Sequence, residues 1–348
     1  MGLVKGLRST NLKYIIMNNN NQLDSWFLDN LICPVDKSRM LQVKNRLICN
    51  ENNHNYPIFR KIPIMLLKER TPTHTSIFQN TWDIVNGKIE IEENLSISQS
   101  EKYVDSFVQK NVAATNSNLY KNLIGKLSRY PIPNFPISSP TKDKLLLDIG
   151  CSWGRWCFSA SRSGFISVGI DPGLDSILAA KRIAKQLNIN SRFIVADARY
   201  LPFRQNLFDY CFSFSVLQHF SKSDVEKVLR EIKHVLKRDG ISKIQMLNKY
   251  GLRSLFIQLK NIFRKSIEFE TRYWSPEELS VTFEKNIGLT KILLGSFFTQ
   301  AQISDRDLFA TKYRIILEIA ELIKKINEKI PFFTKLGDNL FVVSMKKN

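Results

Sequence analysis

The chain has 348 residues, a length that fits a core of ordinary size plus an accessory unit. Its residues are 43% hydrophobic and 24% charged, as in a globular protein. No apolar run reaches the roughly 18 to 20 residues that a membrane-spanning helix requires. The net charge of +19 is spread along the chain, since the thirds divided at Pro140 and Gly240 carry +6, +6 and +7, whereas a nucleic-acid footprint is usually a concentrated stripe.

The N-terminal segment carries no recognisable targeting signal. Its first 17 residues lack the continuous apolar core of a signal peptide. Met17 precedes a polar, Asn-rich stretch and is an alternative start, and residues 1–20 are predicted to be disordered. The five cysteines form no disulfide-rich pattern, which suits a reducing compartment, so we expect a cytoplasmic protein.

Residues 21–68 form a separate pattern of apolar residues around Cys33 and Cys49. This pattern resembles a small α+β zinc-ribbon-like module, in which two Cys-x-x-Cys knuckles supply four thiolates to one metal. Here each knuckle lacks its second cysteine. Asp36 and His54 could complete a mixed site, but the sequence favours a module that has lost its metal and is held by its apolar core.

Residues 69–140 are predicted to be a helical bridge and a linker. From Leu119 onward the apolar residues recur at helical spacing. The stretch 130–136 contains too many prolines for a helix or a central strand. Tyr103 and Tyr120 are candidates to reach a site on the following domain, although packing is the more common role of such residues.

The most informative stretch is 145–156, where an apolar strand ends near Asp148 and a glycine turn follows at once. Gly150 and Gly154 allow a sharp turn and a close approach of the backbone to a ligand. The helix that begins near Arg155 offers unpaired amide groups at its start. This pattern predicts a nucleotide-type cofactor at the carboxyl edge of a parallel sheet.

Three further strands are predicted at 166–170, 192–196 and 208–214, separated by helical or turn sequence as in a doubly wound sheet. Asp171 follows the first of them and can accept hydrogen bonds from both hydroxyls of a ribose. Asp197 follows the second and can accept one from an adenine amino group. Together these two residues favour an adenosine-containing cofactor.

At this point the chain resembles the class I S-adenosylmethionine-dependent methyltransferases, in the branch that acts on small molecules. The resemblance implies an α/β fold with a Rossmann-like, doubly wound, seven-stranded and mostly parallel sheet, with S-adenosylmethionine as cofactor. Ser152 departs from the family, which often has glycine there. The matching stretches are DIGCSWG at 148–154, GIDP at 169–172, ADARYLPF at 196–203, FDYCFSFSVLQHF at 208–220 and LKRDG at 236–240. The implied cofactor-binding residues are Asp148, Gly150, Cys151, Gly154, Asp171, Pro172, Asp197, Ala198 and Phe214.

His219 is the candidate general base, because it follows the fourth strand where the family's substrate pocket begins, and its reference pKa of about 6.5 suits proton removal. A packing or capping role is equally open. The loop 213–216 lacks the Asn/Asp-Pro-Pro-aromatic pattern of methyltransferases that act on planar amines. The predicted acceptor is therefore a small or lipid- or sugar-linked molecule, methylated at oxygen or carbon.

The remainder of the methyltransferase domain, 141–348, is predicted to contain a lid insertion at about 248–300. A basic amphipathic helix over 252–265 suits a lid or a peripheral membrane contact, and the lid is favoured. Ser275 begins a capping box. A final antiparallel strand is expected at 339–344. Weak substrate-binding candidates are Asn248, Arg272 and Tyr273.

Alternative functions remain open from the sequence. The module and the positive charge also suit an RNA or protein methyltransferase, and the fold alone suits a non-catalytic binding or scaffold protein. A dehydrogenase is a remote alternative. Nucleic acid is disfavoured but not excluded as a partner, no metal is predicted, and the oligomeric state is not predicted.

Overall fold

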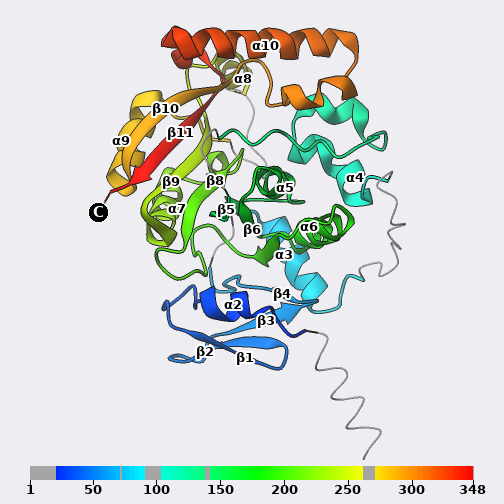
Figure 1. Ribbon diagram of the computed structural model, residues 1–348, viewed down its shortest axis with the longest axis vertical. Helices are drawn as coiled ribbons and strands as arrows, with labels where there is room; N and C mark the ends of the chain where they lie inside the picture. Colours follow the sequence, from blue (N-terminus) through cyan, green and yellow to red (C-terminus); the bar gives the residue numbers. More distant parts are fainter. Residues whose placement is uncertain (1–20, 71–72, 91–102, 138–141, 262–270, 348) are drawn as a thin grey trace, which may run out of the picture.

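The computed structural model describes residues 21–70, 73–90, 103–137, 142–261 and 271–347. Two parts are visible in Figure 1: a small N-terminal sheet at one end of the molecule, and a large sheet with helices on both faces. The predicted disorder of residues 1–20, the alternative start at Met17 and the end of the basic helix at 262–265 lie outside the described residues.

The N-terminal part is a four-stranded antiparallel sheet in the order β1-β2-β3-β4, preceded by one short helix. Its apolar side chains, among them Met40, Leu47 and Tyr56, are buried in one cluster with residues of the large sheet. An α+β module ahead of the catalytic sheet was predicted, and this small antiparallel sheet is present. Its elements are α2 (Ser25–Asn30), β1 (Met40–Val43), β2 (Arg46–Cys49), β3 (Asn55–Phe59) and β4 (Ile62–Pro63).

The large sheet has seven strands in the order β10-β11-β9-β8-β5-β6-β7. The neighbours from β7 to β9 pair in parallel, and β11 alone is antiparallel to the strands on both of its sides. This confirms the predicted seven-stranded, mostly parallel sheet with an antiparallel last strand. The strands are β5 (Leu145–Ile149), β6 (Ile166–Asp171), β7 (Arg192–Val195), β8 (Phe208–Ser213), β9 (Leu236–Leu247), β10 (Gly288–Ser296) and β11 (Asn339–Lys346).

Alternating side chains of the strands divide the core into two layers. Leu147 and Ile149 of β5 join the cluster that contains the apolar faces of α7 and α9, whereas Leu146 faces Trp156 of α5. On the α5 side, α6 adds its apolar face. The helices are α5 (Arg155–Arg162), α6 (Leu174–Gln186), α7 (Lys222–Val235) and α9 (Pro276–Asn286).

The N-terminal module covers the edge strand β7. Ile64 bridges Val195 in parallel, and the Met65 amide donates to the Val195 carbonyl at 2.7 Å. An open strand edge is a template for unwanted pairing, and the module closes this one.

The bridge before β5 is helical only in part. It contains α3 (Thr75–Val85), α4 (Ser106–Thr115) and a 3₁₀ segment, η1 (Asn118–Leu123). The helical spacing from Leu119 therefore gives a short 3₁₀ turn, and Leu127 is buried outside any helix. The Tyr103 side chain is exposed, and its proximity to a site stays a prediction.

The segment 248–300, predicted as a lid insertion, contains two elements of the catalytic framework. α9 packs on α7, and β10 is a strand of the large sheet, so both belong to the catalytic framework. The predicted capping box is confirmed, because Ser275 and Glu278 bond to each other's backbone amides. What lies outside the framework in this region is α8 (Leu252–Asn261).

A buried carboxylate joins three distant segments. Asp305 is fully buried in the 3₁₀ segment η3 (Ile303–Leu308), and it accepts hydrogen bonds from the Tyr120 hydroxyl and from Arg155 at 3.2 Å, with Arg129 at 3.5 Å. The predicted role of Tyr120 near a site is thus replaced by a structural one. Arg155 is the first residue of α5, so this network fixes the start of the helix that follows the glycine turn.

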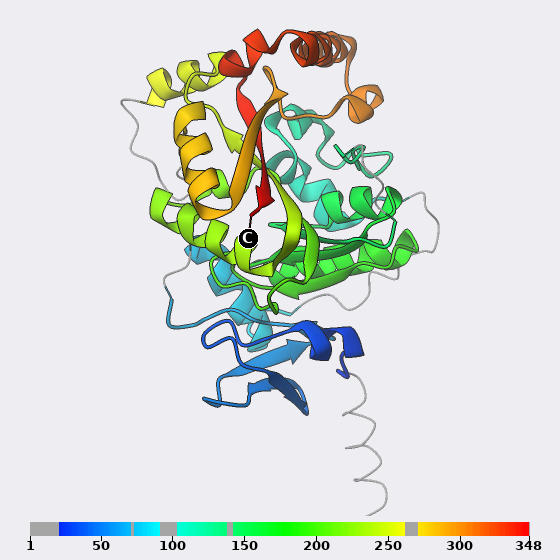
Figure 2. The same cartoon turned by 60° about the vertical axis from the view of Figure 1, so that its left-hand side comes forward.

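Two further elements complete the end of the chain: α10 (Thr311–Lys329) and the 3₁₀ segment η4 (Pro331–Leu336). Figures 1 and 2 both place α8 and α10 at the end of the molecule opposite the N-terminal module. Within the described residues, no helix has the length and apolar character needed to cross a membrane.

Candidate active site

The glycine turn after β5 requires its glycines. Gly150 has φ +75°, and a Cβ there would lie 2.3 Å from a methyl carbon of Val216. Gly154 has φ +85°, begins α5, and would place a Cβ 2.7 Å from the ring of Phe158. Both positions therefore combine a left-handed backbone with close packing, which no other residue tolerates.

Ser152 adopts the glycine-like conformation that the family pattern implies at its position, with φ +48°. Its amide donates to Asp171 Oδ2 at 3.0 Å, so the strained backbone points an N–H at the neighbouring strand. The departure from glycine changes the side chain here and leaves the turn intact.

Asp171 ends β6 and holds two turns at once. Oδ1 accepts the Gly173 amide at 2.9 Å while Oδ2 accepts that of Ser152. Burial raises the pKa of Asp171 to about 6, against the lowering effect of these two amides. The next residue, Pro172, accepts a bond from Thr81 of α3 through its carbonyl oxygen, so the bridge packs on this turn.

Asp148 lies in β5 and is almost completely buried. The pKa of Asp148 is raised to about 7, chiefly by burial. The Cys157 thiol, which donates to Oδ2 at 3.4 Å, lowers this pKa, and the charge of Asp171 raises it. Burial also raises the pKa of Cys157 to about 11 and that of Cys151 well above its ordinary value. These thiols are therefore neutral packing groups and not nucleophiles.

Asp197 is paired with a residue that the sequence reasoning missed. Arg199 donates to both carboxylate oxygens, with Nη2 at 2.7 Å from Oδ2, and its amide donates to Oδ1 at 2.9 Å. Arg199 also lies 3.5 Å from Asp224. The arginine stands two residues after Asp197 in the stretch 196–203, and this spacing was the available signal. Ala198, between them, is buried.

Beyond β8 a cluster of amide side chains surrounds Ser215. Its amide donates to Gln245 Oε1 at 2.7 Å, and its hydroxyl accepts from Gln218 Nε2 at 3.0 Å and donates to Gln300 Oε1 at 3.3 Å. Gln218 Oε1 and Gln245 Nε2 are buried and find no hydrogen-bond partner among the described residues. A buried polar atom left in this state costs about 1–3 kcal/mol.

His219 stands beside this cluster. Its Nε2 lies 3.4 Å from Gln218 Nε2, and its ring centroid is 5.7 Å from that of His74. Arg272 holds the segment in place, since its backbone amide donates to the Gln218 carbonyl at 2.8 Å and its Nη1 donates to the His219 carbonyl at 3.0 Å. The half-buried Tyr273 follows, and burial raises its pKa.

Two predicted site residues also make contacts within the fold. The ring of the half-buried Phe214 lies 4.9 Å from that of Trp156 and 6.1 Å from that of Phe341. Asn248 is fully buried, and both of its amide hydrogens go to carbonyl oxygens, those of Lys335 and Gly337. The cofactor contact of Phe214 and the substrate contact of Asn248 stay predictions.

Comparison with known proteins agrees with this geometry. A family described as "Methyltransferase domain" matches residues 146–240. The ubiquinone biosynthesis O-methyltransferase of Pelagibacter ubique is 30% identical over 171 residues, which are 46% of this chain and 70% of that protein. The chain belongs to the class I S-adenosylmethionine-dependent methyltransferases. The enzyme class, the fold and the cofactor predicted from the sequence are thereby confirmed.

Other relatives of the methyltransferase are less informative about its reaction. The uncharacterized protein MJ1252 of Methanocaldococcus jannaschii is 28% identical over 196 residues, 50% of this chain and 72% of that protein. Among solved structures, the PH0226 protein of Pyrococcus horikoshii has a TM-score of 0.42 and 20% identity, with 71% of this chain and 96% of that chain covered. The structural likeness is distant.

We predict that Asp148→Asn makes the cofactor-free methyltransferase more stable at neutral pH. A carboxyl whose folded pKa of about 7 exceeds its unfolded value of 3.8 contributes stability below pH 4 that is lost as the pH rises through 7. Between these limits the wild-type free energy of unfolding should fall more steeply than that of the variant, by at most about 1.4 kcal/mol per pH unit. Urea unfolding at pH 4.5, 6 and 8 measures it.

The matched control is Asp307→Asn, because Asp307 is three-quarters exposed. Its pH profile should coincide with that of the wild type. An Asp148→Asn profile parallel to the wild type would contradict the raised pKa.

Proposed function

We propose that this methyltransferase transfers the methyl group to an oxygen or carbon atom of a small or lipid- or sugar-linked acceptor. The observation that carries the proposal is the amide cluster around Ser215. Gln218 Oε1 can accept a hydrogen bond and Gln245 Nε2 can donate one, and both lack partners among the described residues. A hydroxyl group supplies both a donor and an acceptor. The name of the Pelagibacter relative, an O-methyltransferase, supports the same choice.

The cofactor would lie along the carboxyl edge of β5, β6 and β7. Asp171 would accept bonds from the ribose hydroxyls through lone pairs that the two backbone amides leave available. Asp197 would face the adenine, with Arg199 fixing its carboxylate. The glycine turn would approach the amino-acid end of the cofactor. The proposed cofactor-binding residues are Asp148, Gly150, Cys151, Gly154, Asp171, Pro172, Asp197 and Ala198.

The cofactor supplies a methyl group on a sulfonium that is already a good leaving group. The chain's own contribution is then to align the acceptor and exclude water. Gln218 and Gln245 would orient the acceptor hydroxyl. His219, in its neutral form, would take the hydroxyl proton at a ring nitrogen. Arg272 would keep the histidine segment in position through its bonds to the two backbone carbonyls.

We expect Asp171→Ala to weaken S-adenosylmethionine binding by at least about 100-fold. The substitution removes the acceptor for the ribose hydroxyls and the bond that holds the Ser152 turn. The loss of two charge-assisted hydrogen bonds corresponds to about 3 kcal/mol or more. Calorimetric titration of wild type and variant measures it. Asp307→Ala is the surface control and should bind as the wild type does. Near-normal affinity in a folded Asp171→Ala protein would refute the placement.

We expect the wild-type protein to transfer the methyl group from labelled cofactor to a phenol. In the His219→Ala variant, kcat should fall by about 10²-fold or more, because the general base is lost. Gln218→Ala should mainly raise KM for the acceptor, since it removes an orienting bond. A panel of phenols with and without a prenyl tail, sugars and total RNA tests the acceptor class. Transfer to RNA alone, with binding that weakens steeply as salt rises, would replace this proposal by the RNA alternative.

An exposed apolar surface favours a lipid-linked acceptor. On α10, Ile315, Ile319, Leu322 and Ile326 recur on one helix face and are each 42–58% exposed. The helix α8, which lies at the same end of the molecule (Figures 1 and 2), also carries four exposed apolar residues. These are Leu252, Leu255, Phe256 and Leu259.

The charges of these two helices suit an anionic membrane. Together α8 and α10 carry seven basic and three acidic residues, among them the exposed Lys260, Lys325 and Lys329. Apolar side chains bordered by cations are the pattern of helices that lie in a bilayer interface. α8 also begins five residues after β9 ends, at the carboxyl edge of the sheet. We therefore assign this surface to peripheral contact with an anionic bilayer.

We predict that the protein floats with vesicles of phosphatidylcholine and phosphatidylglycerol and less with phosphatidylcholine alone. The double variant Phe256→Glu, Leu322→Glu should lose about tenfold or more in partitioning, because it places two charges on the apolar surface. Val281→Glu, at an exposed apolar position of α9, is the matched control and should bind as the wild type does. Equal binding by the double variant, or a dimer that it dissociates, would overturn the assignment.

A further inference from the structure

Four metal-binding side chains of the N-terminal module converge on one point. Cys33, Asp36, Cys49 and His54 each place a ligand atom within 4.8 Å of the other three. Cys33 Sγ lies 3.5 Å from His54 Nδ1, and Asp36 Oδ2 lies 3.2 Å from His54 Nδ1 and 3.1 Å from Cys49 Sγ. Cys33 and Asp36 lie in the loop after α2, whereas Cys49 ends β2 and His54 lies in the turn before β3.

These separations are close to the edges of a zinc tetrahedron. Metal–ligand distances of 2.0–2.3 Å at tetrahedral angles place ligand atoms about 3.3–3.8 Å apart. The three separations above fall within a few tenths of an ångström of that range, and the other three are at most 4.8 Å. Changes of about 1 Å or less in these separations would therefore let the four ligand atoms surround one ion.

Polar contacts hold both sulfur atoms in the cluster. The Asn52 amide donates to Cys49 Sγ at 3.5 Å, and the Ser38 hydroxyl lies 2.9 Å from the same sulfur. Cys33 Sγ lies 3.3 Å from the Tyr56 hydroxyl. These contacts keep both cysteine side chains directed at the cluster.

The carboxylate is oriented by the same kind of support. Ser38 donates to Asp36 Oδ1 through its amide at 3.0 Å and through its hydroxyl at 2.8 Å, which turns Oδ2 toward the cysteine and histidine. Asn52 Nδ2 donates to Oδ2 at 2.7 Å. Bonds of this type fix metal ligands in place and raise affinity.

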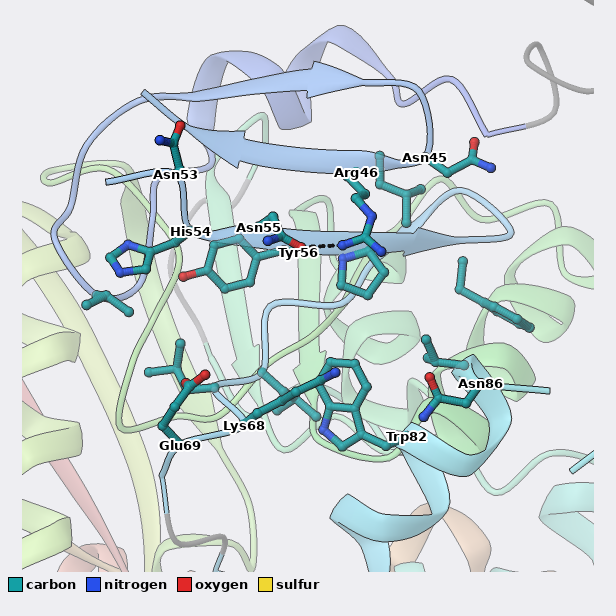
Figure 3. A pocket seen from close by; sticks show the side chains of 17 residues that line it. Asn45, Arg46, Asn53, His54, Asn55, Tyr56, Lys68, Glu69, Trp82 and Asn86 are labelled. Carbon is teal, nitrogen blue, oxygen red and sulfur yellow. Dashed lines mark hydrogen bonds between the residues drawn. The ribbon is translucent and has the colours of Figure 1, made fainter. Parts of the chain in front are cut away.

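An ion can reach the cluster from one side. The two cysteines are buried, whereas the His54 side chain is 37% exposed. His54 also lines a cavity of about 560 Å³ between the module and α3. Figure 3 shows His54 at one end of this cavity, with Tyr56 beside it and Trp82 on the opposite wall. None of the proposed cofactor-binding residues lines the cavity.

We propose that Cys33, Asp36, Cys49 and His54 bind one zinc ion in a closed, structural site. The two sulfurs, the imidazole and the carboxylate form a borderline-soft set that zinc prefers to magnesium or calcium. With four protein ligands, no position stays open for a water nucleophile, so the role of the ion is to hold the two loops together. The sequence favours a module without metal, and the geometry of the two replacement ligands argues the opposite.

The site has a direct connection to the catalytic domain. Lys37, next to the ligand Asp36, donates to Glu231 of α7 at 2.7 Å and to the Leu201 carbonyl at 3.2 Å. The Ile32 amide donates to the Pro202 carbonyl at 3.0 Å. Both carbonyls lie in the segment that follows Asp197, so loss of the ion should also loosen this segment.

The test is the metal content of the full-length protein, purified without chelators and measured by mass spectrometry, together with Co²⁺ titration of the stripped protein. We expect one zinc per chain and tetrahedral, thiolate-coordinated Co²⁺ absorption. The variant Cys33→Ser, Cys49→Ser should bind Co²⁺ more than about 100-fold more weakly, since even outer-shell changes cost 10- to 100-fold. Cys211→Ala, with a buried cysteine in β8, should bind as the wild type does.

Asp36→Cys keeps the test decisive if the double variant does not fold. A third thiolate should raise the intensity of the sulfur-to-cobalt absorption by about half and leave the stoichiometry at one. A wild-type protein without metal that also fails to bind Co²⁺ under reducing conditions would overturn the proposal. So would an unchanged cobalt spectrum in folded Asp36→Cys.

Discussion

The carboxylate of Asp171 is the contact on which the cofactor edge of this methyltransferase depends. It accepts a hydrogen bond from an amide of the turn after β5 and another from the turn after β6, so one half-buried side chain fixes the spacing of two loops. Burial makes its charge costly and raises its pKa. The neighbouring Asp148 suffers the same cost more strongly. Both carboxylates therefore carry a desolvation cost in the cofactor-free protein.

Much of this site was predictable because its residues are adjacent to strand ends. Asp148, Asp171 and Asp197 stand at or next to the carboxyl ends of apolar runs, and a parallel sheet brings such ends together. Gln245 could not be found in this way, since it lies inside β9 and only the tertiary structure places it at Ser215. The same applies to β10, whose assignment to the framework depends on pairing with β11, a strand about 50 residues further along the chain. It also applies to α9, which belongs to the framework because it packs on α7.

The N-terminal module shows where spacing alone misleads. The spacing of the sequence names Asp36 and His54 as candidates for a mixed site, but the loss of two cysteines makes a module without metal the favoured prediction. Ser38 and Asn52 supply the information that the pattern lacks, by fixing the direction of the carboxylate. The sequence could therefore name the four residues, but only the structure shows that their ligand atoms converge.

The position of β11 between β9 and β10 has a consequence for synthesis on the ribosome. β10 finishes at Ser296, but its only sheet neighbour among the described residues is completed at Lys346, about 50 residues later. At translation rates of about 5–20 residues per second, β10 waits for several seconds with both edges unpaired. During that interval the nascent chain exposes an unpaired strand that can pair with other chains, and chaperone binding to this segment would prevent such pairing.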